Sequence, residues 1–139
     1  MKCLPRKTLK QLIVSAFAAG CLSPALLFAD TLTWDGSDST WDSASNWLVN
    51  GSPSSRAPAS GDTVNLGSGT ITSGTVNIAG MTINHTGGTR VITGNDYTLS
   101  GGMVVNQTGG TLQFTGSGDP WLNIGETAGQ SVTYSISGG

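Results

Sequence analysis

One phrase occurs twice in this chain, and the distance between its copies constrains the fold more than any other feature. Residues 83–94 read INHTGGTRVITG, and residues 105–116 read VNQTGGTLQFTG. Aligned without a gap, residues 80–94 and 102–116 are identical at more than half of their positions, and most substitutions keep their character. Chance in a Gly/Thr-rich sequence explains the shared TGGT but not the retained apolar positions. We therefore interpret the phrase as a structural repeat.

A repeat of about 22 residues predicts a right-handed parallel β-solenoid, in which successive rungs of short strands stack along one axis. Equivalent residues of successive rungs then lie about 4.8 Å apart, and apolar side chains form interior columns. Asn84 would lie over Asn106 in an amide ladder, although turn propensity also explains both asparagines. Because many short strands fit that fold too, an antiparallel β-sandwich is the alternative.

The chain divides into three segments. Residues 1–29 read as a secretory signal peptide, with four basic residues near the start, an apolar run and a small residue at the expected cleavage site after Ala29. A membrane anchor is the alternative, but the apolar run is short and interrupted. The AAGC sequence ending at Cys21 loosely matches a lipoprotein box, which leaves lipidation open. Residues 30–62 are predicted to form a Trp-rich N-terminal cap, and residues 63–139 to form the solenoid rungs.

Cleavage would leave an acidic mature chain without cysteine. The mature chain would keep two basic residues, Arg56 and Arg90, and eight acidic residues, which give a net charge of −6. No nucleic-acid partner is therefore expected. Cys3 and Cys21 both lie in the predicted leader. Disulfides stabilise many small exported domains, and here strand stacking would have to take their place.

Titratable residues are too sparse in the mature sequence to indicate a hydrolase or lyase site. His85 is the one histidine, and Gln107 takes its place in the second copy, so we interpret it as a rung residue. Asp96, Asp119 and Glu126 are scattered, whereas glycosidases need two facing carboxylates. We expect no catalytic residue and no cofactor.

An oxygen-rich loop, DGSDSTWD at residues 35–42, is the best metal candidate in the sequence. Asp35, Asp38 and Asp42 could supply oxygen ligands to calcium, but the EF-hand spacing is absent. We favour turn chemistry for these aspartates and expect no metal.

Three tryptophans, Trp34, Trp41 and Trp47, lie close together in the sequence of the predicted cap. Exposed tryptophan rings stack on sugars, which makes these three glycan-stacking candidates. The first rung of a solenoid must also be covered, or it exposes an unpaired strand edge. We favour a plug over a sugar site.

The mature sequence resembles the start of the autotransporter-associated β-strand repeat proteins, which are large exported bacterial proteins with a β-helical passenger. The residues that carry the resemblance are Trp34-Asp35-Gly36, Trp41, Ala44, Asn46-Trp47, Pro58 and Gly61-Asp62. Residues 121–139, WLNIGETAGQSVTYSISGG, are similar to a recurring rung of the same group. Neither a membrane barrel nor a sorting tail follows, so we expect an N-terminal fragment of a longer protein.

The resemblance implies an exported structural or adhesive passenger at the outer surface of a Gram-negative bacterium, without catalytic activity. A carbohydrate-binding module is the first alternative, and a polysaccharide lyase or hydrolase is the second. Extracellular polysaccharide and host surfaces are the candidate partners. Residues 131–139 alternate Val132, Tyr134 and Ile136 with polar residues and carry no charge, which also predicts self-association through an open last rung.

Overall fold

The computed structural model describes residues 29–74, 76–94, 96–125 and 128–138. Almost all of the expected signal peptide, including Cys21, lies outside the described residues, as does Glu126. The described part is an all-β protein with one short 3-10 turn, η1 (Ala44–Asn46). Its strands are β1 (Thr31–Trp34), β2 (Ser39–Thr40), β3 (Trp47–Val49), β4 (Ser52–Pro53), β5 (Thr63–Leu66), β6 (Thr70–Ser73), β7 (Thr82–His85), β8 (Thr89–Ile92), β9 (Asp96–Leu99), β10 (Val104–Gln107), β11 (Thr111–Phe114), β12 (Trp121–Ile124) and β13 (Thr133–Ile136).

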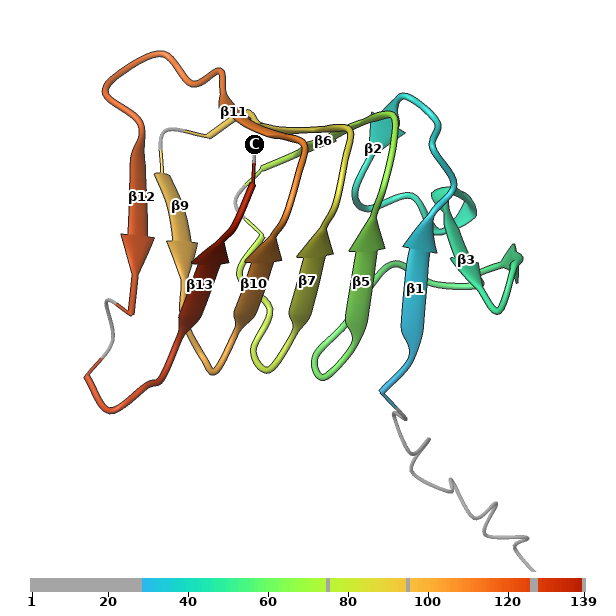
Figure 1. Ribbon diagram of the computed structural model, residues 1–139, viewed down its shortest axis with the longest axis horizontal. Helices are drawn as coiled ribbons and strands as arrows, with labels where there is room; N and C mark the ends of the chain where they lie inside the picture. Colours follow the sequence, from blue (N-terminus) through green and yellow to red (C-terminus); the bar gives the residue numbers. More distant parts are fainter. Residues whose placement is uncertain (1–28, 75, 95, 126–127, 139) are drawn as a thin grey trace, which may run out of the picture.

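The strands form three sheets whose pairings are parallel from β5 onward. A seven-stranded sheet has the order β13-β10-β7-β5-β1-β3-β4, a four-stranded sheet the order β11-β8-β6-β2, and a two-stranded sheet pairs β12 with β9. In Figure 1 the arrows of β1, β5, β7, β10 and β13 lie side by side and point the same way. The chain visits the three sheets in the same order twice, as β7, β8, β9 and then β10, β11, β12.

The register places the two copies of the repeated phrase on neighbouring strands. Ile83 pairs with Val105 and Asn84 with Asn106, in parallel and at the spacing of the repeat. These predicted neighbours are confirmed. The repeat continues across β8 and β11, where Ile92 pairs with Phe114. Antiparallel pairing throughout, which the sandwich alternative requires, is not found among the described strands.

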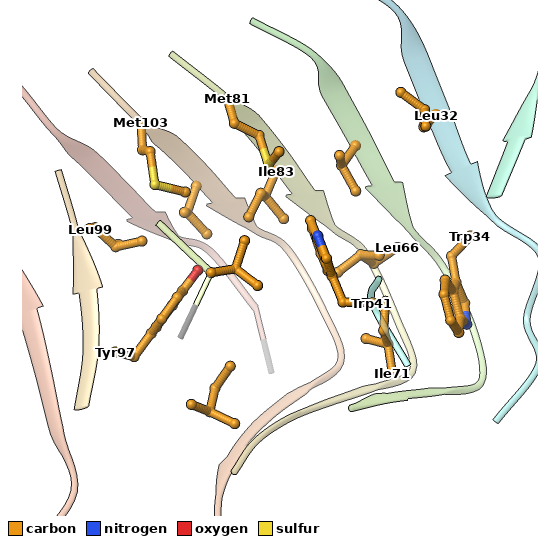
Figure 2. Packing of buried hydrophobic residues seen from close by; sticks show 14 of the residues in the cluster. Leu32, Trp34, Trp41, Leu66, Ile71, Met81, Ile83, Tyr97, Leu99 and Met103 are labelled. Carbon is orange, nitrogen blue, oxygen red and sulfur yellow. The ribbon is translucent and has the colours of Figure 1, made fainter. Parts of the chain in front are cut away.

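The core lies between the sheets, because alternate residues of each strand point inward. In β5, β6, β7, β8 and β10 the second and fourth residues are buried and the first and third are half-buried. Most buried side chains are apolar, and Figure 2 shows them directed into the space between strands of different sheets. Parallel stacking with inward alternation is the arrangement that buries such short strands.

The TGGT turns need both of their glycines. A Cβ on Gly109 would overlap the carbonyl oxygen of Thr86 in the preceding copy, and a Cβ on Gly87 would overlap the carbonyl oxygen of Gly67. Gly88 and Gly110 have φ of 73° and 72°, which side chains with a Cβ rarely adopt. A Cβ on Gly88 would also lie 2.6 Å from the carbonyl oxygen of Gly69, so both glycines allow close backbone approach and the second in addition supplies the positive φ.

Candidate functional site

The three N-terminal tryptophans form a buried cluster rather than a surface. Trp34, Trp41 and Trp47 are at most 4% exposed. Trp47 packs edge-to-face with both others, with ring centroids 5.1 and 4.9 Å away and interplanar angles of 71°. Trp34 and Trp47 are direct partners in the antiparallel pair of β1 and β3.

Hydrogen bonds lock two of these rings. The indole of Trp47 donates to the carbonyl oxygen of Trp41 at 2.8 Å, and that of Trp34 donates to the carbonyl oxygen of Ser37 at 3.0 Å. Stacking on a sugar requires an exposed ring face, and these three rings are buried, as the favoured plug requires. The sequence could not decide this, because burial depends on the pairing of β1 with β3.

The asparagines of the repeat form a ladder on the outer side of the seven-stranded sheet. The side-chain nitrogen of Asn106 donates to Asn84 at 3.0 Å, and that of Asn84 donates to Asn65 at 2.9 Å. The two-residue ladder expected from the sequence thus has a third member. Asn65 lies in β5, outside the repeated phrase, and only the β5–β7 register reveals it.

The aspartate loop at residues 35–42 is held by turn hydrogen bonds. Asp35 accepts from the backbone and hydroxyl of Ser37 at 2.9 and 2.6 Å, and these bonds lower its pKa. Asp38 accepts from the backbone N–H of Thr70 at 2.9 Å, and Asp42 is exposed. No group of three or more His, Cys, Asp or Glu side chains among the described residues could hold a metal ion.

An ion-pair network closes the loop before β5. The Asp62 side chain is 1% exposed and accepts from the backbone N–H groups of Asp30 and Ala59 and from the guanidinium of Arg56. Burial acts to raise the pKa of Asp62, but the bonds from Arg56, Asp30 and Ala59 together outweigh it, so its pKa is lowered. Arg56 also reaches Asp30 at 2.7 Å. This network fixes the crossing from the N-terminal cap into the stacked strands.

His85 points into the core. It is 4% exposed, and its Cα partners on the neighbouring strands are Leu66 and Gln107. Burial lowers its pKa, and the positive charge of Arg90 lowers it further. The residue is therefore neutral near pH 7 and acts as a core side chain.

Arg90 is the functional candidate that the sequence reasoning missed. It is the second residue of β8 and is 2% exposed, with Ile71 and Leu112 as its partners on either side. The repeat alignment contains the signal, because Arg90 occupies the position of Leu112 in the second copy. A charged residue at an inward position is unusual, since arginine is almost never fully buried unless paired.

Two aromatic rings and one hydroxyl surround the guanidinium of Arg90. Its central carbon lies 5.1 Å from the ring centroid of Trp41 and 4.7 Å from that of Tyr97. One terminal nitrogen, Nη1, donates to the Tyr97 hydroxyl at 2.7 Å. Burial raises the pKa of Tyr97, so its hydroxyl is neutral and brings no negative charge.

The remaining donors around Arg90 lack acceptors. Arg90 Nε and Nη2 and the indole nitrogen of Trp41 are buried without a hydrogen-bond partner within the described part of the chain. Each unfilled buried donor costs about 1–3 kcal/mol, and burying an unpaired ion costs several more. Cation–π contacts return only about 2 kcal/mol each when desolvated, so the cluster is electrostatically incomplete.

The outer strands carry exposed apolar side chains. Trp121, Leu122 and Ile124 in β12 are 63%, 39% and 49% exposed, and Ile136 in β13 is 67% exposed. β11, β12 and β13 each form one edge of their sheets. Figure 1 shows β12 and β13 at the end of the stack opposite to β3. Such residues on unpaired strand edges are typical of an interaction surface.

Comparison of the chain with protein-family models, with curated proteins and with solved structures found no match. Within the described residues, none of the helical segments has the length and apolar character needed to cross a membrane.

Proposed function

We propose that the mature chain is a right-handed parallel β-solenoid with a Trp-rich cap, which serves as a structural or adhesive passenger of an exported bacterial surface protein. The observation that carries the proposal is the parallel register of the repeated phrases, with Asn84 paired to Asn106 and Ile92 to Phe114. The right-handed sense rests on the general rule that parallel crossover connections are right-handed in about 98% of cases.

The cap supports this assignment. β3 and β4 add antiparallel strands beside β1, and the edge strand β4 is two residues long and ends in Pro53. Short edge strands with proline prevent further strand addition. The tryptophan cluster fills the interior behind them, as a plug of the first rung would.

The resemblance to autotransporter-associated β-strand repeat proteins supports export to the outer surface of a Gram-negative cell. Expression of the full chain in a Gram-negative host tests this step. We expect a mature species that begins at Asp30 by intact mass and is digested by protease added to whole cells. A species that keeps Met1 and resists the protease would contradict export.

Adhesion to extracellular polysaccharide or to a host surface is the expected activity, and no catalytic activity is proposed. Trp121, at 63% exposure, is the exposed tryptophan of the described chain. A glycan array tests the ligand class, with Trp121→Ala as the test variant and Leu122→Ala on the same strand as its control. Loss of binding in the first variant alone would favour a carbohydrate-binding module over a purely structural passenger.

Self-association through the outer strands is the second expected property. Ile136 is 67% exposed, and its strand β13 has one unpaired edge. We expect concentration-dependent oligomers in analytical ultracentrifugation. Ile136→Lys should reduce them, whereas Ser135→Lys, whose side chain points outward from the same strand, should do so less. A monomeric wild-type chain at high concentration would contradict this property.

A further inference from the structure

The buried cluster around Arg90, which includes Trp41 and Tyr97, holds a positive charge outside the ion pairs found among the described residues. Both of those ion pairs belong to Arg56. A guanidinium group keeps its charge in proteins, and Arg90 is 2% exposed, so bulk water does not screen it. Its hydrogen-bond partner, Tyr97, is a neutral phenol whose pKa burial raises.

The geometry of the unfilled donors selects the kind of partner. Nη1 of Arg90 is used by Tyr97, which leaves Nε and Nη2. These two nitrogens carry hydrogens on the same edge of the guanidinium plane, and such a fork matches anions. The indole N–H of Trp41, whose ring lies 5.1 Å from the guanidinium carbon, is a third buried donor without an acceptor in the described part of the chain. All of these groups donate, so they need an acceptor.

We propose that the core of this protein binds a small inorganic anion of the chloride class, held by Nε and Nη2 of Arg90 beside the Trp41 indole. An anion supplies both the acceptor and a negative charge, whereas a water molecule supplies only the acceptor. A monatomic ion suits the position better than a carboxylate or phosphate ligand, because Trp41, Arg90 and Tyr97 are each at most 2% exposed. The ion would join β8 to the loop after β2, and the hydrogen bond from Nη1 to Tyr97 joins β9 to the same guanidinium.

The surroundings of the cluster agree with a site for an anion. His85 and Tyr97, whose pKa values Arg90 perturbs, are both neutral near pH 7. Figure 2 shows Tyr97 and Trp41 projecting into the same interior from different parts of the chain. The strand neighbours of Arg90, Ile71 and Leu112, are apolar and offer no competing acceptor from their side chains.

Salt-dependent unfolding of the full chain tests the proposal. Unfolding midpoints are measured by circular dichroism in sodium chloride, sodium bromide and sodium gluconate at matched ionic strength. A ligand that binds only the folded state raises the folding equilibrium constant about tenfold for each tenfold rise in concentration above its Kd. We expect that dependence in chloride and bromide but not in gluconate. Equal stability of the wild-type chain in all three salts would overturn the proposal.

Two arginine variants separate this site from general salt effects. Arg90→Met removes the fork and should abolish the difference between chloride and gluconate. Arg56→Met removes an arginine from the Asp62 network and should keep the difference between chloride and gluconate. If Arg90→Met were still more stable in chloride than in gluconate, the assignment of the anion to Arg90 would be wrong.

A crystallographic measurement covers the case in which Arg90→Met does not fold. Wild-type crystals grown in bromide should give an anomalous peak within hydrogen-bond distance of Arg90 Nε and Nη2. An ordered water without anomalous signal at that position would contradict an anion site.

Discussion

Replacing Gly109 by alanine tests the close stacking of the TGGT turns. The added Cβ would overlap the carbonyl oxygen of Thr86 and lie 3.1 Å from its carbon, and both are backbone atoms that cannot rotate away. Overpacking of this kind lowers the free energy of unfolding by about 1–3 kcal/mol. Because the neighbouring backbone is rigid, we expect a loss for Gly109→Ala near the upper end of this range. For a domain of this size that loss lowers Tm on the order of 10 °C.

Gly74→Ala is the matched control. Its Cβ would meet nothing within 4 Å, and Gly74 does not have a positive φ. The change should leave stability unchanged or raise it by about 0.4–1 kcal/mol, because alanine has less freedom in the unfolded chain. Both variants are compared by urea unfolding followed by circular dichroism. Equal stability of Gly109→Ala and Gly74→Ala would refute the close approach of Thr86 to Gly109.

Three further predictions concern the buried polar residues and the asparagine ladder. His85→Gln, which copies Gln107, should remove a pH dependence of the stability. Because the pKa of His85 is lower in the folded chain, the stability that neutral His85 contributes is present above its unfolded pKa of 6.5 and is lost as pH falls through its folded pKa. Urea titrations at several pH values would show this loss in the wild-type chain and not in the variant. Asp62→Asn places a side-chain amide among the three donors that the buried carboxylate accepts from, and it should cost about 3 kcal/mol in the same assay; a loss below about 1 kcal/mol would contradict that role. Asn84→Ala removes two ladder hydrogen bonds and should cost about 2 kcal/mol, twice the loss for Asn106→Ala, which removes one.

The parallel pairing of β7 with β10 could be predicted because two independent features of the repeat indicate it. Apolar residues such as Ile83 and Val105 hold the inward positions, and the TGGT glycines hold the turns where neighbouring backbones approach. Both signals are local in each copy, and the constant spacing of the repeat then sets the register between β7 and β10. Neither signal depends on contacts with the rest of the chain.

The other registers could not be predicted, because their connections differ in length. Val64 pairs with Ile83 across a shorter stretch of chain than the repeat, and Val105 pairs with Tyr134 across a longer one. The spacing of the repeat therefore does not predict the register of β5 with β7 or of β10 with β13.

The buried polar residues were the least predictable part of the candidate site. Arg90 is a lone charge in a polar, Gly-rich sequence, and its burial depends on Trp41, far earlier in the chain, and on Tyr97 in the following strand. The tryptophan cluster likewise depends on β1 pairing with β3. Such environments arise only when separate segments meet, which explains why spacing alone identified the ladder and not the arginine.

Nuclear Overhauser contacts in the isotopically labelled chain would show whether successive strands stack in parallel with this register. We expect backbone contacts across the column Val64, Ile83, Val105 and Tyr134, with the parallel pattern at each step. We also expect contacts between the side-chain amides of Asn84 and Asn106. Antiparallel contacts between β7 and β8 or between β10 and β11, with none between Ile83 and Val105, would contradict the parallel stacking.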